Sequence, residues 1–339
     1  MGSFDISQSG RAPIALVVSQ GEALGDAATR LAAYRAIRAA WPDHRIVSVA
    51  ARGSAFEGPL EPFRAEFVDQ TITHEPRINT VAGFRSLIGE LGTVRRIFDL
   101  RSTPRAIVSY LGAGGAVETY VANQPGLFLR RGLAPGWRAR PKHNYLRYHR
   151  MVEAAAGRPL PFDPWLAPLP DAERRAAQLL PGGPYIGLAP GLFRLRKAWP
   201  RERFAALAAD VGRLGLRPVF LLGLYEADER AWAQTAAPGA AIIDLAAAAG
   251  NAASLAPLIH AAAGRLAVAI TTEGGIGHLM ATRNLPLITL AGPTNAIKWK
   301  PVTETWRRIA SQDFGSRHME EIPVDAVLNA VAELARTGA

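Results

Sequence analysis

The sequence contains no cysteine, few lysines and no apolar run long enough to cross a membrane. The absence of cysteine excludes disulfides, thiolate catalysis, zinc fingers and iron–sulfur clusters. A membrane-spanning helix needs roughly 20 mainly apolar residues, and the richest stretch, residues 245–270, is interrupted by Gly, Asn, Pro, His and Arg. The first residues, MGSFDISQSG, lack the charged and apolar regions of a secretory signal. We therefore expect a soluble, cytoplasmic protein.

The composition predicts a folded chain with an anionic partner. A length of 339 residues favours two domains, and a hydrophobic fraction of 49% is enough for buried cores. The chain has 39 Lys and Arg against 29 Asp and Glu, which gives a net charge of +10. This excess favours a nucleotide, a phosphorylated glycan, a nucleic acid or an anionic membrane surface. The seven histidines are scattered and no H-E-x-x-H or Asp-x-Asp occurs, so we predict no metal site.

Strands and helices alternate along the first half of the sequence. Residues 14–19 form a short continuous apolar run, which is typical of a buried parallel strand. Residues 27–41 carry apolar side chains at helical spacing, and 45–50 and 94–100 predict further strands. Strands separated by helices indicate βαβ units and a parallel sheet.

A proline-rich stretch around residues 158–184 divides the chain, and the strand–helix pattern starts again after it. Because proline limits regular pairing, we place the domain junction there. The expected organisation is an N-terminal Rossmann-like domain over 1–165, a connector over 166–184 and a C-terminal Rossmann-like domain over 185–318. A final segment, 319–339, is expected to be helical and to pack back across the junction.

Ligands of open parallel sheets bind outside the carboxyl ends of the strands, so residues just after strands carry the functional argument. Gly21 and Gly25 allow a tight turn after the first strand, and Asp26 then stands at a helix start. Asp26 is either an N-cap or a general base that takes a proton from an acceptor hydroxyl. The sequence pattern by itself does not decide between these two interpretations of Asp26.

Two loops of the second half contain groups that suit a diphosphate. In GLAPGLFRLRKAWP, the cations Arg194, Arg196 and Lys197 follow a strand, although a solvated basic loop explains them equally well. In the second loop, Glu273, Gly274 and Gly275 lie between a strand and a helix whose free N–H groups can receive an anion. His278 on the first turn suits either packing or binding, and Thr294 can hydrogen-bond a phosphate.

These motifs, in this order, resemble glycosyltransferase family 9, the heptosyltransferases of lipopolysaccharide core assembly. GEALGD is similar to the Gly-Asp element of the family, and RKAWPRERFAALA to its Lys-x-Trp-Pro element. EGGIGHLMATRNLPLITLAGPTN is similar to its Asp-(Ser/Thr)-Gly-x-x-His-Leu…Gly-Pro-Thr-Asp element. The resemblance implies an α/β fold of GT-B architecture, in which two Rossmann-like domains bind acceptor and sugar nucleotide on either side of a cleft.

The resemblance also implies roles for individual residues. Asp26 would be the general base, and Lys197 would neutralise the diphosphate. The implied donor-binding residues are Arg194, Arg196, Asp244, Glu273, Gly274, Gly275, His278 and Thr294. Three positions depart from the family pattern: Glu273 replaces Asp, Gly274 replaces a hydroxyl residue, and Asn295 replaces the final Asp. Glu22 also stands where the family is usually uncharged.

The stretch 130–150 holds seven Arg and Lys residues, no Asp or Glu, and interleaved aromatic side chains at Trp137, Tyr145 and Tyr148. One interpretation is an acceptor face for an acidic saccharide, with Arg130, Arg131, Arg138, Arg140 and Lys142 as its cations. A nucleic-acid surface uses the same chemistry. The third interpretation is a solvated basic surface whose Tyr and Trp side chains turn into the core.

The sequence thus predicts an inverting, metal-independent glycosyltransferase without a cofactor. Its expected donor is a nucleotide sugar such as ADP-heptose. Its expected acceptor is an anionic saccharide or glycolipid, with peripheral contact to the inner membrane and no specific nucleic acid. Two alternatives remain: a nucleotide-sugar 2-epimerase of the same architecture, and a non-catalytic protein that binds polyanions or glycans.

Overall fold

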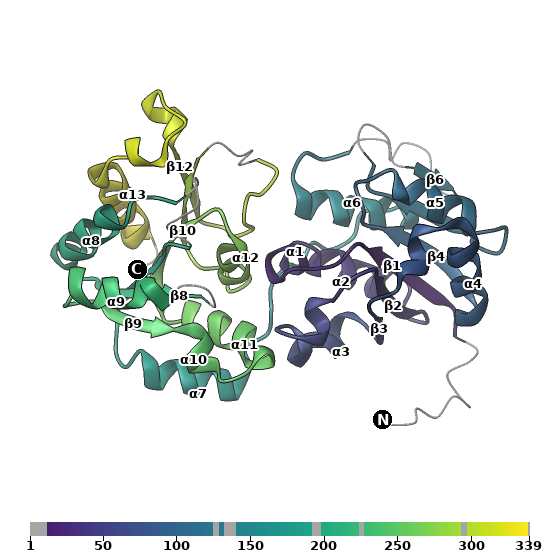
Figure 1. The fold of residues 1–339 in the computed structure, drawn as a ribbon, viewed down its shortest axis with the longest axis horizontal. Coiled ribbons are helices and arrows are strands. Elements are labelled where there is room, and N and C mark those ends of the chain that lie inside the picture. Colours follow the sequence, from purple (N-terminus) through teal and green to yellow (C-terminus); the bar gives the residue numbers. More distant parts are fainter. Residues whose placement is uncertain are drawn as a thin grey trace. The chain divides into compact units, whose positions relative to one another are not determined.

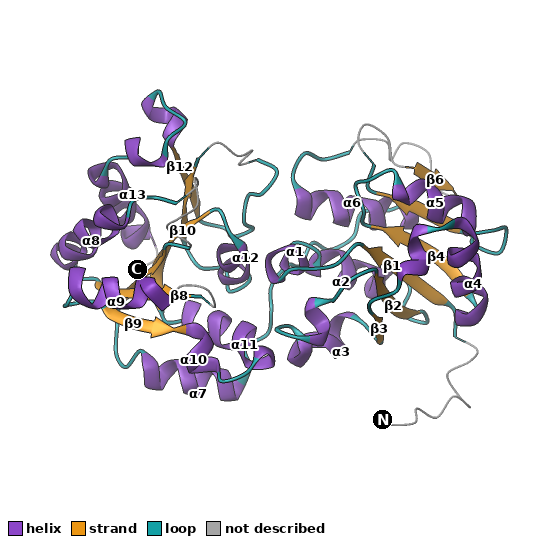
Figure 2. Cartoon of the chain, viewed as in Figure 1, coloured by secondary structure: helices purple, strands orange, loops and turns teal. Residues whose placement is uncertain are grey.

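The computed structural model describes residues 12–124, 129–131, 140–191, 198–223, 227–292 and 297–337. The chain forms two compact units, Met1–Pro164 and Trp165–Ala339. Each unit is an α/β layer structure with a central sheet and helices packed around it (Figures 1 and 2). The predicted α/β class with two Rossmann-like sheets is confirmed. The expected domain boundaries at residues 165, 184 and 318 remain predictions.

The sheet of the first unit has the strand order β3-β2-β1-β4-β5-β6. Its strands are β1 (Ile14–Ser19), β2 (Arg45–Ala50), β3 (Gln70–Ile72), β4 (Val94–Asp99), β5 (Thr119–Ala122) and β6 (Leu129–Arg131). All pairs are parallel except β5 with β6. Every residue of β1 is buried, as the continuous apolar run predicts for a central parallel strand.

The helices of the first unit are α1 (Leu24–Ala28), α2 (Leu31–Ala40), α3 (Arg64–Phe67), α4 (Val81–Leu91), α5 (Arg105–Gly112) and α6 (Asn144–Ala156). The single helix expected over 27–41 is therefore wrong, because the chain breaks between α1 and α2. The first helix ends at its C-cap Thr29, whose hydroxyl donates a hydrogen bond to the Asp26 carbonyl at 2.6 Å. Arg30 then occupies the N-cap position of the second helix, without a side-chain capping hydrogen bond.

The sheet of the second unit has the order β12-β11-β10-β7-β8-β9, and all of its pairs are parallel. Its strands are β7 (Tyr185–Ala189), β8 (Arg217–Leu222), β9 (Ala241–Asp244), β10 (Leu266–Thr272), β11 (Leu287–Ala291) and β12 (Trp306–Ala310). Its helices are α7 (Pro170–Leu179), α8 (Arg201–Asp210), α9 (Ala227–Ala236), α10 (Leu245–Ala249), α11 (Ala252–Ala263), α12 (Gly275–Ala281) and α13 (Val324–Thr337). Read in chain order, both sheets follow the 3-2-1-4-5-6 arrangement of nucleotide-binding folds.

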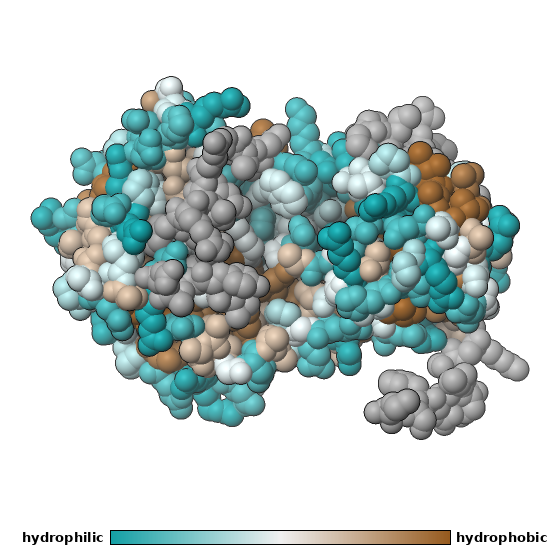
Figure 3. All heavy atoms as spheres, viewed as in Figure 1, coloured by the Kyte–Doolittle hydropathy of each residue, from teal (hydrophilic) through white to brown (hydrophobic). Residues whose placement is uncertain are grey.

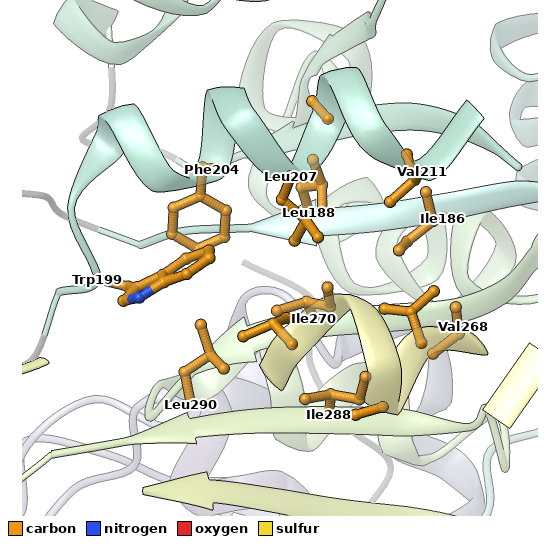
Figure 4. Close-up of a cluster of buried hydrophobic side chains, with 14 of the residues drawn as sticks. Ile186, Leu188, Trp199, Phe204, Leu207, Val211, Val268, Ile270, Ile288 and Leu290 are labelled. Atoms are coloured by element: carbon orange, nitrogen blue, oxygen red, sulfur yellow. The ribbon is translucent and has the colours of Figure 1, made fainter. Parts of the chain in front are cut away.

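Trp199 anchors the core on one face of the second sheet (Figure 4). Its fully buried ring meets Phe204 of α8 edge-on, with 4.9 Å between ring centroids, and its Nε1 donates to the Ile322 carbonyl at 3.0 Å. Aliphatic side chains of β7, β10 and β11 complete the cluster, which Val327 and Val331 of α13 also join. The final helix thus packs on the second unit, and packing of 319–339 across the junction stays a prediction.

Apolar side chains gather on the surface where α5 lies, in the brown area of Figure 3. Ile107 and Leu111, one helical turn apart, are 48% and 56% exposed. No helix within the described ranges is both long and apolar enough to span a membrane.

His260 lies on the buried face of α11, where it contacts the backbone of Thr282 and Leu166. Its exposed fraction is 1%. Burial, and secondly the nearby Arg283 guanidinium, lower the pKa of His260 to about 4 from the ordinary 6.5. The ring therefore stays neutral in the folded protein at pH values where the unfolded chain protonates it.

This difference predicts an acid-labile fold. As the pH falls from about 6.5 towards 4, the unfolded chain binds one more proton, so the free energy of unfolding decreases and then levels off. Between about pH 7.5 and pH 5 the loss assigned to His260 is roughly 2 kcal/mol. Urea unfolding of the wild type and of His260→Gln at both pH values measures it. The variant should lose less stability over this range, whereas substitution of the exposed His318 should leave the dependence unchanged. Equal pH dependence in wild type and His260→Gln would contradict the assignment.

Candidate functional site

Three neighbouring strand ends of the second sheet define the candidate site. Parallel strands direct their carboxyl ends to one edge of a sheet, and β11, β10 and β7 are adjacent there. The Thr272 hydroxyl at the end of β10 donates to the Pro190 carbonyl after β7 at 2.9 Å, which ties two of these ends together. Gly191 has φ +69°, and a side chain there would lie 2.9 Å from the Thr272 hydroxyl. Only glycine fits this turn without strain.

The start of α12 presents backbone N–H groups at this edge. Gly274 is its N-cap, in an extended conformation, and no side chain caps the helix. Gly274 and Gly275 are both exposed. A buried Gly277 keeps the helix close to β10, since a Cβ there would lie 2.8 Å from the Thr271 hydroxyl. The two exposed glycines leave the backbone open to a ligand.

Glu273 stands between β10 and α12 with an unsatisfied carboxylate. Both of its oxygens are buried, and neither has a hydrogen-bond partner in the structure. A buried carboxylate without donors is costly, and a ligand hydroxyl or a cation at this point would relieve that cost. Among the sequence-predicted donor residues that the structure describes, Glu273 therefore shows the clearest sign of a missing partner.

His278 and Asp244 already have structural contacts. The His278 ring is 7% exposed and faces the Trp299 ring edge-on at 6.4 Å between centroids. Asp244 accepts a hydrogen bond from the Ala247 N–H at 3.0 Å and so caps α10. Asp244 ends β9, three strands away from β10 in the sheet, which corresponds to roughly 14 Å. The structure therefore brings Glu273, Gly274, Gly275 and His278 together and leaves Asp244 at the other end of the same edge.

Several predicted site residues fall outside the described ranges. These are Lys197, Arg194, Arg196, Thr294 and Arg138. Arg130 and Arg131 lie on β6, next to β5, where the structure fixes the backbone only.

Asp26 lies in the first turn of α1, beyond the carboxyl end of β1 in the first unit. The N-cap of this helix is Ala23, so the capping interpretation of Asp26 is wrong. The residue is half-buried, and none of the hydrogen bonds or ion pairs described for the structure uses its carboxylate. A carboxylate on a helix start that accepts no hydrogen bond from the described residues can accept a proton from a ligand.

The basic stretch 130–150 divides into a described and an undescribed part. Arg140 donates to Asn123 Oδ1 at 2.7 Å, and burial together with the nearby Arg147 lowers the pKa of Arg140. Lys142 is exposed. Tyr145 and Tyr148 are 1% and 7% exposed, so the idea that these rings stack on a saccharide is wrong: they fill the core beneath α6. Trp137 lies outside the described residues.

The sequence analysis missed two buried ion pairs near the strand ends of the first unit. Glu22 pairs with Arg30, and Asp99 at the end of β4 pairs with Arg101. The Asp99 carboxylate accepts from Arg101 Nε at 2.8 Å, from Arg101 Nη2 at 2.6 Å and from the Ser109 and Tyr120 hydroxyls at 2.8 and 3.0 Å. A carboxylate at the end of a largely apolar strand was the available signal for Asp99. No local pattern indicates the pairing of Glu22 with Arg30.

Comparison with known proteins agrees with this geometry. Residues 129–322, more than half of the chain, match the model of glycosyltransferase family 9 (heptosyltransferase). No match is found among curated proteins.

Solved structures share the complete fold at low sequence identity. A family 9 glycosyl transferase from Veillonella parvula DSM 2008 superposes with a TM-score of 0.72 at 17% identity, covering 96% of this chain and 98% of the other. E. coli ADP-heptose lps heptosyltransferase II superposes with a TM-score of 0.64 at 18% identity, covering 96% of this chain and 99% of the other. The E. coli heptosyltransferase WaaC with ADP superposes with a TM-score of 0.59 at 16% identity, covering 95% of this chain and 100% of the other.

The close contact between α12 and β10 leads to a prediction about Gly277. In Gly277→Ala, the added methyl group forces the helix away from Thr271, and overpacking of this kind costs about 1–3 kcal/mol. The gain in helix propensity, about 1 kcal/mol, offsets only part of that cost. We expect a lower urea midpoint for the second unit than in the wild type.

Gly239→Ala is the matched control, because Gly239 is an exposed turn residue with no atom within 4 Å of an added Cβ. It should unfold like the wild type. Equal midpoints for both variants would show that Gly277 does not set the position of α12.

Proposed function

Because the chain belongs to glycosyltransferase family 9, the family of the heptosyltransferases, we propose that it moves a heptose from ADP-heptose to a saccharide hydroxyl. The chain is a glycosyltransferase, and 96% of its length follows the GT-B fold of its solved neighbours. The family match carries the proposal. The open edge of the second sheet, with its uncapped helix start and unsatisfied Glu273, supports a donor site there.

In the proposed reaction the acceptor hydroxyl oxygen attacks C1 of the donor sugar from the face opposite the diphosphate. The new C1–O bond forms as the bond from C1 to the diphosphate oxygen breaks, which inverts the configuration at C1. Asp26 takes the hydroxyl proton, and the nucleoside diphosphate leaves with the bonding electrons. Support for Asp26 comes from its carboxylate, which is half-buried and has no described hydrogen bond.

The departing diphosphate is proposed to bind Lys197, with Arg194 and Arg196, and the backbone of Gly274 and Gly275. Glu273 and His278 would bind beside the donor sugar and phosphates, Thr294 would hydrogen-bond a phosphate, and Asp244 would contact the ribose. The separation of about 14 Å between the β9 and β10 ends suits a ligand with a nucleoside at one end and a sugar at the other. Since cations and helix N–H groups supply the charge stabilisation, the reaction is proposed to need no divalent metal. Turnover should then persist in EDTA.

The acceptor is proposed to be an anionic saccharide or glycolipid of the lipopolysaccharide core type. Arg130, Arg131, Arg138, Arg140 and Lys142 are its proposed contacts. The positive net charge and the exposed Lys142 support this assignment. A cytoplasmic location with peripheral contact to the inner membrane also stays a prediction, which cell fractionation tests.

Asp26→Asn should lower kcat by about 10²–10⁴-fold, the usual contribution of a general base. Donor affinity, measured by calorimetry with a nucleotide sugar, should stay the same. Glu61→Gln removes an exposed carboxylate of the same unit and should leave both quantities unchanged. Near-normal kcat in Asp26→Asn would remove this residue from the mechanism.

A thermal-shift panel of nucleoside diphosphates and nucleotide sugars tests the donor. The right donor stabilises the protein by RT ln(1 + [L]/Kd), so ADP-heptose and ADP should raise Tm most. In Lys197→Ala both the shift and the turnover should fall, whereas the exposed Arg213→Ala should match the wild type. A panel in which no diphosphate raises Tm would count against the donor site.

Incubation with the donor alone separates the reaction classes. Release of an epimer without acceptor would indicate a 2-epimerase. Salt-sensitive binding of polyanions without any sugar transfer would indicate a binding protein.

A further inference from the structure

The turn 297–299, which follows β11, carries a lysine and a tryptophan that contact each other. The Lys298 Nζ lies 4.9 Å from the centre of the Trp299 ring, which is a cation–π contact. Both residues are half-buried. Neither was among the predicted donor contacts, so the pair adds a cation and an aromatic ring to the segment beyond β11.

Trp299 connects this turn to α12. Its ring lies 6.4 Å from the His278 ring, centroid to centroid, with 61° between the ring planes. His278 is the fourth residue of α12, and Glu273 lies just before that helix begins. Within the sheet, Thr272 of β10 is paired with Leu290 of β11, so the chain leaves both strands side by side. The turn therefore lies against the helix that follows Glu273.

A second lysine–tryptophan pair lies close by in sequence but is held differently. The Lys300 Nζ lies 4.8 Å from the centre of the Trp306 ring. Trp306 belongs to β12, the edge strand, and its Nε1 donates to the Thr289 hydroxyl of β11 at 3.0 Å. The sheet thus fixes this second ring, whereas Trp299 packs against α12. Two pairs of the same chemistry therefore differ in whether they lie beside the candidate site.

Glu273 and Lys298 have complementary hydrogen-bonding capacities. An ionised carboxylate only accepts, an ammonium only donates, and a sugar hydroxyl does both. Both Glu273 oxygens are buried without a hydrogen-bond partner, so they do not bind Lys298 directly. A hydroxyl group between the two would donate to Glu273 and accept from Lys298, which removes the cost of the unsatisfied carboxylate.

Resting on the proposed donor site, we propose that Lys298 determines specificity for the transferred sugar by donating to its hydroxyl groups. The strand order supports this end of the ligand. β11 lies on the side of β10 away from β7, β8 and β9, and β9 ends at Asp244, the proposed ribose contact. A nucleotide sugar laid along this edge from β9 therefore reaches β10 and β11 with its sugar. Trp299 is the positioning residue, because its ring holds the Lys298 ammonium next to α12.

Lys298→Gln should weaken binding of the sugar and spare the nucleotide. The Kd of ADP-heptose should rise about tenfold, the usual loss of one hydrogen bond from a charged donor. The Kd of ADP, which lacks the sugar, should stay the same. Lys298→Arg keeps the charge and can stack on the ring, so it should retain most of the affinity for ADP-heptose. Calorimetry on the full-length protein with both ligands measures these values.

Trp299→Leu tests the positioning role. Loss of the cation–π contact should raise the Kd of ADP-heptose about two- to fivefold, again without a change for ADP. In the Lys298→Gln background the same substitution should have little further effect, because the ammonium that the ring holds is already gone. A ring that only packs against His278 would give the same loss in both backgrounds. Trp299→Phe, which retains an aromatic face, should bind ADP-heptose like the wild type.

Lys300→Gln is the matched control, since it removes the same charge from the pair on β12. It should bind both ligands like the wild type. An unchanged Kd of ADP-heptose in Lys298→Gln, equal losses for ADP and ADP-heptose, or the same loss in Lys300→Gln would overturn the proposal. If Trp299→Leu does not fold, the two lysine variants still decide it.

The two ligands also separate this inference from the proposed function. A wild type that binds neither ADP nor ADP-heptose would refute the donor site, and the role of Lys298 with it. Normal binding of ADP, together with an unaffected Kd of ADP-heptose in Lys298→Gln, would refute the role of Lys298 alone.

Discussion

Parallel strand pairing is the constraint on which both candidate sites depend. It sends every carboxyl end of a sheet to one edge, so residues that are far apart in sequence follow neighbouring strands there. In the second unit this brings the segments after β7, β10 and β11 together, and the Thr272–Pro190 hydrogen bond fixes two of them. In the first unit the same rule places Asp26 beyond the end of β1 and Asp99 at the last residue of the adjacent β4.

Three carboxylates at or beyond such strand ends differ in how many hydrogen-bond donors the protein provides for them. Asp99 is saturated: four side-chain donor groups surround it in a fully buried network, so it has no capacity left for a ligand. Glu273 has buried oxygens without described donors, and Asp26 is half-buried with its carboxylate uncommitted. Burial alone does not distinguish these residues. These residues differ instead in the number of hydrogen-bond donors that the described part of the protein provides.

The central strands and the order of the motifs could be predicted, because continuous apolar runs such as β1 and β7 are local signals. The edge strands β3 and β12 were missed, since QTI and WRRIA are short and partly polar and are defined mainly by their neighbours. The break between α1 and α2 falls at Thr29, whose hydroxyl donates to the Asp26 carbonyl, a local contact that apolar spacing does not encode. The Glu22–Arg30 pair depends on packing of three segments, which no periodicity encodes.

Trp199 and Gly191 have a consequence for protein engineering. Trp199 is held in the core by its contact with Phe204 and its hydrogen bond to the Ile322 carbonyl. Gly191 lies in a turn that only glycine accepts without strain. The chain between them thus begins and ends at two fixed points of the same scaffold. Segments of other sequence can therefore be grafted between these two points while the underlying hydrophobic core is left intact.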